Sequence, residues 1–150
     1  YLQQGLKLSE QLGDVQSKAL CLSSLGVAYL VIGDSQNAIK NLEEGFKTAQ
    51  ISGDLYLQGL NLANLGEANY NSANFARAIY TGCLGMYLLN QIASQEWRKV
   101  AKLITILQGQ IGAEAFQNAL EQNRPKIISV IGVDGYDYIP QLLEEYRREM

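Results

Sequence analysis

The chain has 150 residues, with 12 Lys and Arg against 15 Asp and Glu, so its formal net charge is only −3. This length suits one domain with a sizeable core, and the slightly acidic balance argues against a basic nucleic-acid surface. Histidine is absent, which excludes Ser-His-Asp and Cys-His catalysis and imidazole zinc sites. Cys21 and Cys83 lie in apolar helical patterns, so we expect buried, reduced thiols rather than a disulfide scaffold.

Hydropathy along the chain bears on its compartment. No apolar run approaches the roughly 18 residues of a membrane span, and no secretory signal pattern opens the sequence. We therefore expect a cytoplasmic protein without membrane contact, and leave open a signal upstream of residue 1.

Three Gly-Asp pairs divide the first part of the chain, at residues 13–14, 33–34 and 53–54. Glycine accepts the left-handed conformation that ends a helix, and aspartate caps the free N–H groups of the next helix. Apolar residues recur between the pairs at helical spacing, as at Leu22 and Leu25. The pattern predicts tight turns between helices over residues 1–12, 14–31, 35–52, 55–71 and 74–90.

The sequence matches itself when it is shifted by 40 residues. Glycine falls on glycine, apolar on apolar and helix-ending pairs on each other. The repeated small residues are spaced where two paired helices must approach closely: these are Gly26, Ala38 and Gly45 in one copy, and Gly66, Ala78 and Gly85 in the next.

One stretch resembles a tetratricopeptide repeat: Leu22-x-x-Leu25-Gly26-x-x-Tyr29-x-x-x-Gly33-Asp34-x-x-x-Ala38-Ile39. The second copy is similar but looser, since its tyrosine is displaced by one position and Ala73-Asn74 replaces Gly-Asp. The period of about 40 residues is similar to the longer variant found in kinesin light chains and in many bacterial repeat proteins. The resemblance covers residues 1–93. It implies an all-α fold, a right-handed superhelical stack of antiparallel helix pairs.

The expected organisation places helical repeats over residues 1–123 and a C-terminal loop and capping helix over residues 124–150. Within the repeats we expect a half repeat at 1–12, full repeats at 14–53 and 54–93, and a divergent pair at 94–123. The divergent pair should lose the 40-residue register and break at Gly109 and Gly112. Beyond it we expect a short segment at 126–130, a loop at 132–138 and a capping helix at 141–148, the two helical pieces following Pro125 and Pro140.

Both ends of the chain suggest a larger assembly. Residues 1–12 match the second helix of a unit whose first helix is missing, so we expect the chain to be part of a longer array. The uncovered face of that helix is a candidate surface for a homodimer. The polar last helix is typical of the cap that ends a repeat array.

The resemblance also implies which residues bind a partner, because the first helices of such units line a concave surface. The candidate partner-binding residues are Ser24, Val27, Val31, Asn64, Glu67, Asn71, Arg98 and Lys102. Asn64, Glu67 and Asn71 follow one helix face at spacings of three and four residues. An asparagine amide both donates and accepts, so it can bind a peptide backbone. The alternative interpretation is an ordinary solvated helix face.

We therefore expect a protein–protein interaction scaffold that binds a peptide or protein, without catalysis, cofactor, metal or nucleic acid. Asp134 and Asp137 lack the alternating oxygen ligands of a calcium loop, so a capped turn is favoured there. An alternative function is the C-terminal sensor or regulatory region of a larger bacterial signalling protein, either a nucleotide-driven switch or a kinase. A further alternative is self-assembly through the N-terminal face.

Overall fold

The computed structural model describes the backbone of residues 1–150 and all side chains except those of Ser9, Gln11 and Leu12. Along this described backbone every regular element is an α-helix, which confirms the all-α expectation. The helices are α1 (Leu2–Leu12), α2 (Val15–Val31), α3 (Ser35–Ser52), α4 (Leu55–Asn71), α5 (Phe75–Gln91), α6 (Trp97–Ile111), α7 (Ala113–Gln122) and α8 (Arg124–Glu149).

The turns that end α1 to α5 are built alike and recur at 20-residue intervals. At each turn one residue has a positive φ: Gly13 (67°), Gly33 (84°), Gly53 (76°), Ala73 (58°) and Ala93 (59°). These values confirm the helix-ending role predicted for the three glycines, and they show that alanine fills the same role twice.

The residue after each of the first four turns caps the next helix. The caps join the side-chain oxygens of Asp14, Asp34, Asp54 and Asn74 to the backbone N–H of Ser17, Asn37, Leu57 and Arg77, at 3.0, 3.2, 2.9 and 3.3 Å. Each bond satisfies one of the free donors at a helix start. As a result α4 begins and ends 40 residues after α2, at both ends.

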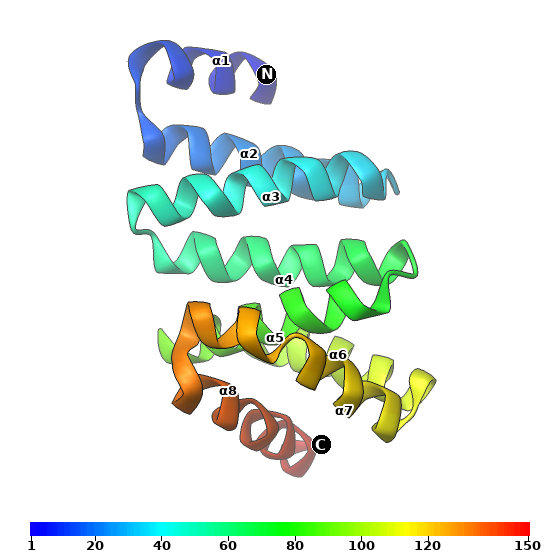
Figure 1. Cartoon of the computed structure of the whole chain (residues 1–150). Helices are drawn as coiled ribbons and strands as arrows, with labels where there is room; N and C mark the ends of the chain where they lie inside the picture. Colours follow the sequence, from blue (N-terminus) through cyan, green and yellow to red (C-terminus); the bar gives the residue numbers. More distant parts are fainter.

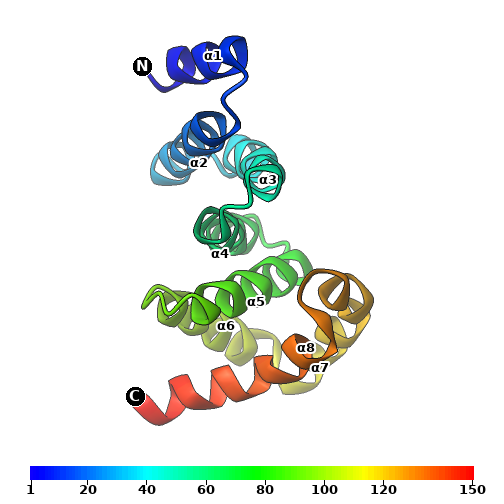
Figure 2. The same ribbon diagram turned by 90° about the vertical axis from the view of Figure 1, so that its left-hand side faces the viewer.

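Successive helices pack side by side from the N-terminal α1 to the C-terminal α8 (Figure 1). The view along the helices places α2 and α4 on one side of the stack and α3 on the other (Figure 2). Contacts agree with this picture, because α2 also touches α4 and α4 also touches α6. Within the described chain, α3 and α5 do not touch each other.

Small residues allow the helices to approach closely, as the sequence predicted. A Cβ atom added at Gly26 would lie 2.5 Å from Leu42 Cδ2, and one added at Gly66 would lie 3.1 Å from Gly82 Cα. At Gly85 the added atom would lie 2.6 Å from the backbone nitrogen of Ala63. These separations are shorter than van der Waals contact, so only glycine fits without a shift of the neighbouring helix.

The third helix pair differs from the prediction. Its first helix, α6, ends at Ile111, which is 40 residues after the end of α4, so the predicted loss of register at this helix is wrong. Gly109 lies inside α6 and the break occurs only at Gly112, where φ is 92°. Ile104 and Leu107 are fully buried, and this burial outweighs the weak helix propensity of a single glycine.

The C-terminal segment is more helical than predicted. Pro125 lies in the first turn of α8, as expected, and Gly132 interrupts that helix with φ 79° and ψ 171°. Residues 133–138 are helical, so the loop predicted at 132–138 is wrong beyond Gly132, and the last helix begins well before Gln141 and includes Pro140. Tyr136 and Ile139 are buried, and their packing holds a helical turn whose Gly and Asp residues favour a loop.

Candidate functional site

The first helices of the successive pairs, α2, α4 and α6, form one side of the stack. Side-chain hydrogen bonds join them at matching positions. Gln16 Nε2 donates to Asp54 Oδ2 at 2.7 Å between α2 and the α4 cap, and Tyr56 Oη donates to Glu96 Oε1 at 2.9 Å between α4 and the start of α6. The Glu96 carboxylate that accepts this bond raises the pKa of Tyr56.

A hollow of about 600 Å³ lies between α4 and α6, and we call it the α4/α6 cleft. Leu60, Ala63, Leu89, Val100, Leu103 and Ile106 give it apolar walls, while Tyr70 and Glu96 lie among its polar residues. Its volume is within the range of about 300–1,000 Å³ that is usual for ligand pockets. An apolar surface with a few polar groups around it is the usual chemistry of a binding site.

The cleft is bounded along the helices by two hydrogen bonds between α4 and α6. The Tyr56–Glu96 bond lies at the N-terminal ends of the two helices. At the other end, Gln110 Nε2 donates to Tyr70 Oη at 2.7 Å. Both bonds join residues that are 40 positions apart, so they hold α4 and α6 in the register of the repeat.

Five of the eight candidate residues from the sequence line this cleft: Val27, Asn64, Glu67, Asn71 and Lys102. The structure therefore brings together residues from three different helices. Whether they bind a partner remains a prediction.

The other three candidates lie outside the cleft. Ser24 and Val31 are exposed on α2, and Val31 is 81% exposed. Arg98 is already engaged, since its Nε and Nη2 donate to the two carboxylate oxygens of Glu149 at 2.7 and 3.0 Å. This bidentate pair raises the pKa of Arg98 and attaches the end of α8 to the start of α6.

Sequence reasoning missed the contribution of α6 to the cleft. Lys99, Leu103 and Ile106 line it, and Ile106 is 44% exposed although it is apolar. The signal that could have found them is the 40-residue match between the ends of α4 and α6. We expected that register to be lost and so did not extend the candidate face to these positions.

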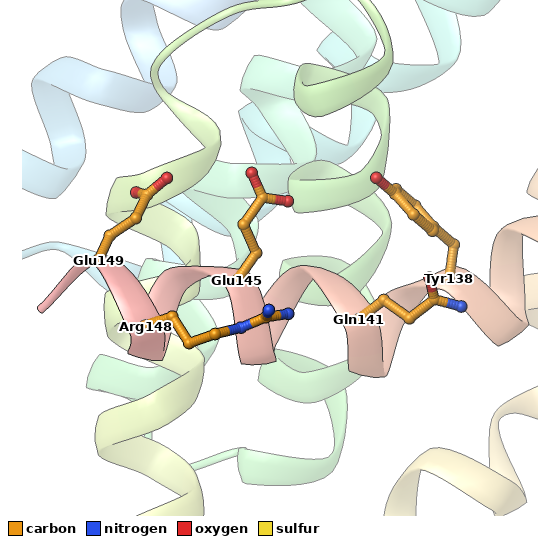
Figure 3. A pocket seen from close by; sticks show the side chains of 5 residues that line it. All are labelled: Tyr138, Gln141, Glu145, Arg148 and Glu149. Atoms are coloured by element: carbon orange, nitrogen blue, oxygen red, sulfur yellow. The ribbon is translucent and has the colours of Figure 1, made fainter.

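A second hollow, of about 390 Å³, lies along the C-terminal half of α8. Its lining residues are Tyr138, Gln141, Glu145, Arg148 and Glu149, and Figure 3 shows all five on this one helix. Glu149 is already paired with Arg98. A single polar helix offers no opposing wall and no apolar floor, so this hollow is a weaker candidate than the α4/α6 cleft.

Reactive and metal-binding groups were assessed across the described residues. Cys83 is fully buried, which raises the pKa of its thiol to about 12 and keeps it from forming a nucleophilic thiolate. Cys21 is only partly buried, so the expectation of two buried thiols is correct for Cys83 alone. No group of three or more Asp, Glu or Cys side chains is placed to hold a metal ion in the described part of the chain.

The helices formed by the described residues include none with both the length and the apolar character needed to cross a bilayer. Comparisons of the chain with protein-family models, with curated proteins and with solved structures find no match. The functional argument therefore depends on the geometry of the cleft and on the repeat itself.

Proposed function

We propose that this chain is a helical-repeat protein of the tetratricopeptide type, which binds a peptide or a protein segment in the α4/α6 cleft. One observation carries the proposal. Five residues chosen from the sequence as partner-binding candidates, from α2, α4 and α6, line a single cleft with apolar walls. Helix bounds and cap hydrogen bonds that recur after 40 residues support the repeat assignment.

Binding in this cleft needs no bond chemistry. The amides of Asn64 and Asn71 are available to hydrogen-bond the backbone of an extended segment, since each amide carries both donors and an acceptor. Leu103 and Ile106 supply apolar contact for one or two partner side chains. Desolvation of such apolar area, at about 25 cal/mol per Å², is the expected source of affinity.

Selection from a random peptide library displayed on phage, with the whole chain as bait, tests the proposal. We expect enriched peptides whose affinity falls at least about tenfold in Asn64→Arg, because a long cation then fills the wall of the cleft. Asn118→Arg is the matched control, since Asn118 is exposed on α7 and does not line the cleft. Peptides that bind Asn64→Arg as well as the unchanged chain, or a selection that enriches nothing, would contradict the proposal.

A further inference from the structure

The length of the α4/α6 cleft limits what it can hold. Tyr56 and Tyr70 are 14 residues apart on α4, and their hydrogen bonds to α6 bound the cleft. At about 1.5 Å per residue, the two bonds are about 21 Å apart along the helix. An extended chain advances about 3.3–3.6 Å per residue, so about six residues fit between them.

The two walls of the cleft carry opposite charges. Glu67 lies on the α4 wall, whereas Lys99 and Lys102 lie on the α6 wall, and all three side chains are exposed. Among the described residues, none of the three forms an ion pair, either with each other or with another group. Glu96 also lies on the α6 side, but Tyr56 donates a hydrogen bond to it at the end of the cleft.

This separation disfavours a partner of uniform charge. A wholly acidic segment would meet Glu67 on one wall, and a wholly basic segment would meet Lys99 and Lys102 on the other. Charges within one cleft lie close to the Debye length of about 8 Å at physiological salt, so such contacts are not fully screened. The charges on the walls therefore select for the sign of each side of the partner.

Building on the proposed function, we infer that the cleft takes an extended segment of about six residues that carries both a basic and an acidic side chain. The basic side chain faces Glu67, and the acidic one faces Lys99 and Lys102. Apolar side chains between them contact Leu103 and Ile106. The segment is thus of mixed charge, with a fixed orientation across the cleft.

The charge composition of peptides selected from a random hexapeptide library tests this inference. We expect peptides with one Lys or Arg and one Asp or Glu to be enriched over wholly acidic and wholly basic ones. An exposed ion pair contributes up to about 1 kcal/mol, so each correct charge should improve affinity up to about fivefold. Glu67→Lys should move the selection towards acidic peptides, and Lys99→Glu with Lys102→Glu towards basic ones.

Lys40→Glu is the matched control, because Lys40 is exposed on α3 and does not line the cleft. It should leave the selected composition unchanged. If peptides bind and Asn64→Arg abolishes binding, but the charge variants leave the selection unchanged, the mixed-charge inference is wrong and the proposed function stands. A selection dominated by wholly acidic or wholly basic peptides overturns the inference too. If no peptide is enriched, both the inference and the proposed function fail.

Discussion

At the scale of single residues, Asn61 is the most unusual side chain in the interior. It is fully buried, and neither amide atom has a hydrogen-bond partner among the described residues. The matching positions 40 residues before and after it hold Cys21 and Ala101, which need no strong hydrogen bond. A Cβ added at Gly45 would lie 3.2 Å from Asn61 Nδ2, just as one at Gly5 would lie 3.2 Å from Cys21 Sγ.

Replacing this amide by the residue found one repeat earlier should stabilise the protein. Asn61→Cys removes a buried polar group without a partner, and such a group costs about 1–3 kcal/mol. We expect the free energy of unfolding in urea to rise by about 1 kcal/mol. Asn69→Ala is the comparison, because Asn69 Nδ2 already donates to Leu65 O at 2.8 Å, so no such gain should appear. A loss of stability in Asn61→Cys would show that the amide has a structural role.

A second prediction at this scale concerns the alanine with positive φ in the α4–α5 turn. Ala73 has φ 58°, whereas the matching Gly33 has φ 84° in the turn one repeat earlier. Left-handed backbone costs a non-glycine residue about 1–2 kcal/mol. Ala73→Gly should therefore raise the free energy of unfolding by about 0.5–1 kcal/mol, after the greater chain entropy of glycine is counted. Gly33→Ala, the reverse change at the matching turn, should lower it, and equal stability for both variants would refute the explanation.

At the scale of the elements, glycine positions separate the close helix contacts from the open helix surfaces. A Cβ at Gly85 on α5 would lie 2.6 Å from the backbone of Ala63 on α4. Around Gly109 on α6 nothing lies within 4 Å of the added atom. The same substitution at the two positions therefore tests whether helix contact, rather than propensity, explains the glycine.

We predict opposite signs for the two alanine variants. Gly85→Ala should destabilise the chain by about 1–3 kcal/mol, because α4 and α5 must separate. Gly109→Ala should stabilise it by about 0.5–1 kcal/mol, because alanine is the better helix former. Chemical denaturation monitored by helical circular dichroism measures both. Destabilisation of similar size in the two variants would be inconsistent with the close α4–α5 contact.

At the scale of the whole molecule, carboxylates at several helix ends link stability to pH. Backbone N–H groups of Ser17 and Leu57 lower the pKa values of Asp14 and Asp54, and the hydrogen bond from Arg98 lowers that of Glu149. Each folded-state pKa is below its unfolded value, so each group stabilises the fold above the unfolded pKa. This contribution is lost as the pH falls through the folded-state pKa.

The melting temperature should therefore stay nearly constant between about pH 7 and pH 5 and fall below about pH 4. Asp54→Asn should flatten part of this fall, because asparagine keeps the cap without a charge, as Asn74 does in the α5 cap. Glu44→Gln is the control, since Glu44 is exposed on α3 and should leave the profile unchanged. An acid transition that Asp54→Asn does not alter would show that the other carboxylates dominate.

Much of the helical pattern could be predicted from the sequence because its causes are local. A left-handed residue such as Gly33 and a cap such as Asp34 act within one turn of the chain. The predicted helices at 35–52 and 55–71 accordingly match α3 and α4 at both ends. The prediction was wrong where burial decides, as at residues 133–138 and Gly109, since burial depends on residues far away in the sequence.

The candidate site shows the same division between local and distant causes. The sequence by itself determined a face of α4 with Asn64, Glu67 and Asn71, because helical spacing places them together. Only the tertiary structure decided that α6 lies opposite at the 40-residue register, with Lys99 and Ile106 as its wall, and that Arg98 turns to Glu149 instead. The physical reason is that a helix fixes the spacing of its own side chains, whereas a cleft exists only where two helices are held apart by contacts between distant residues.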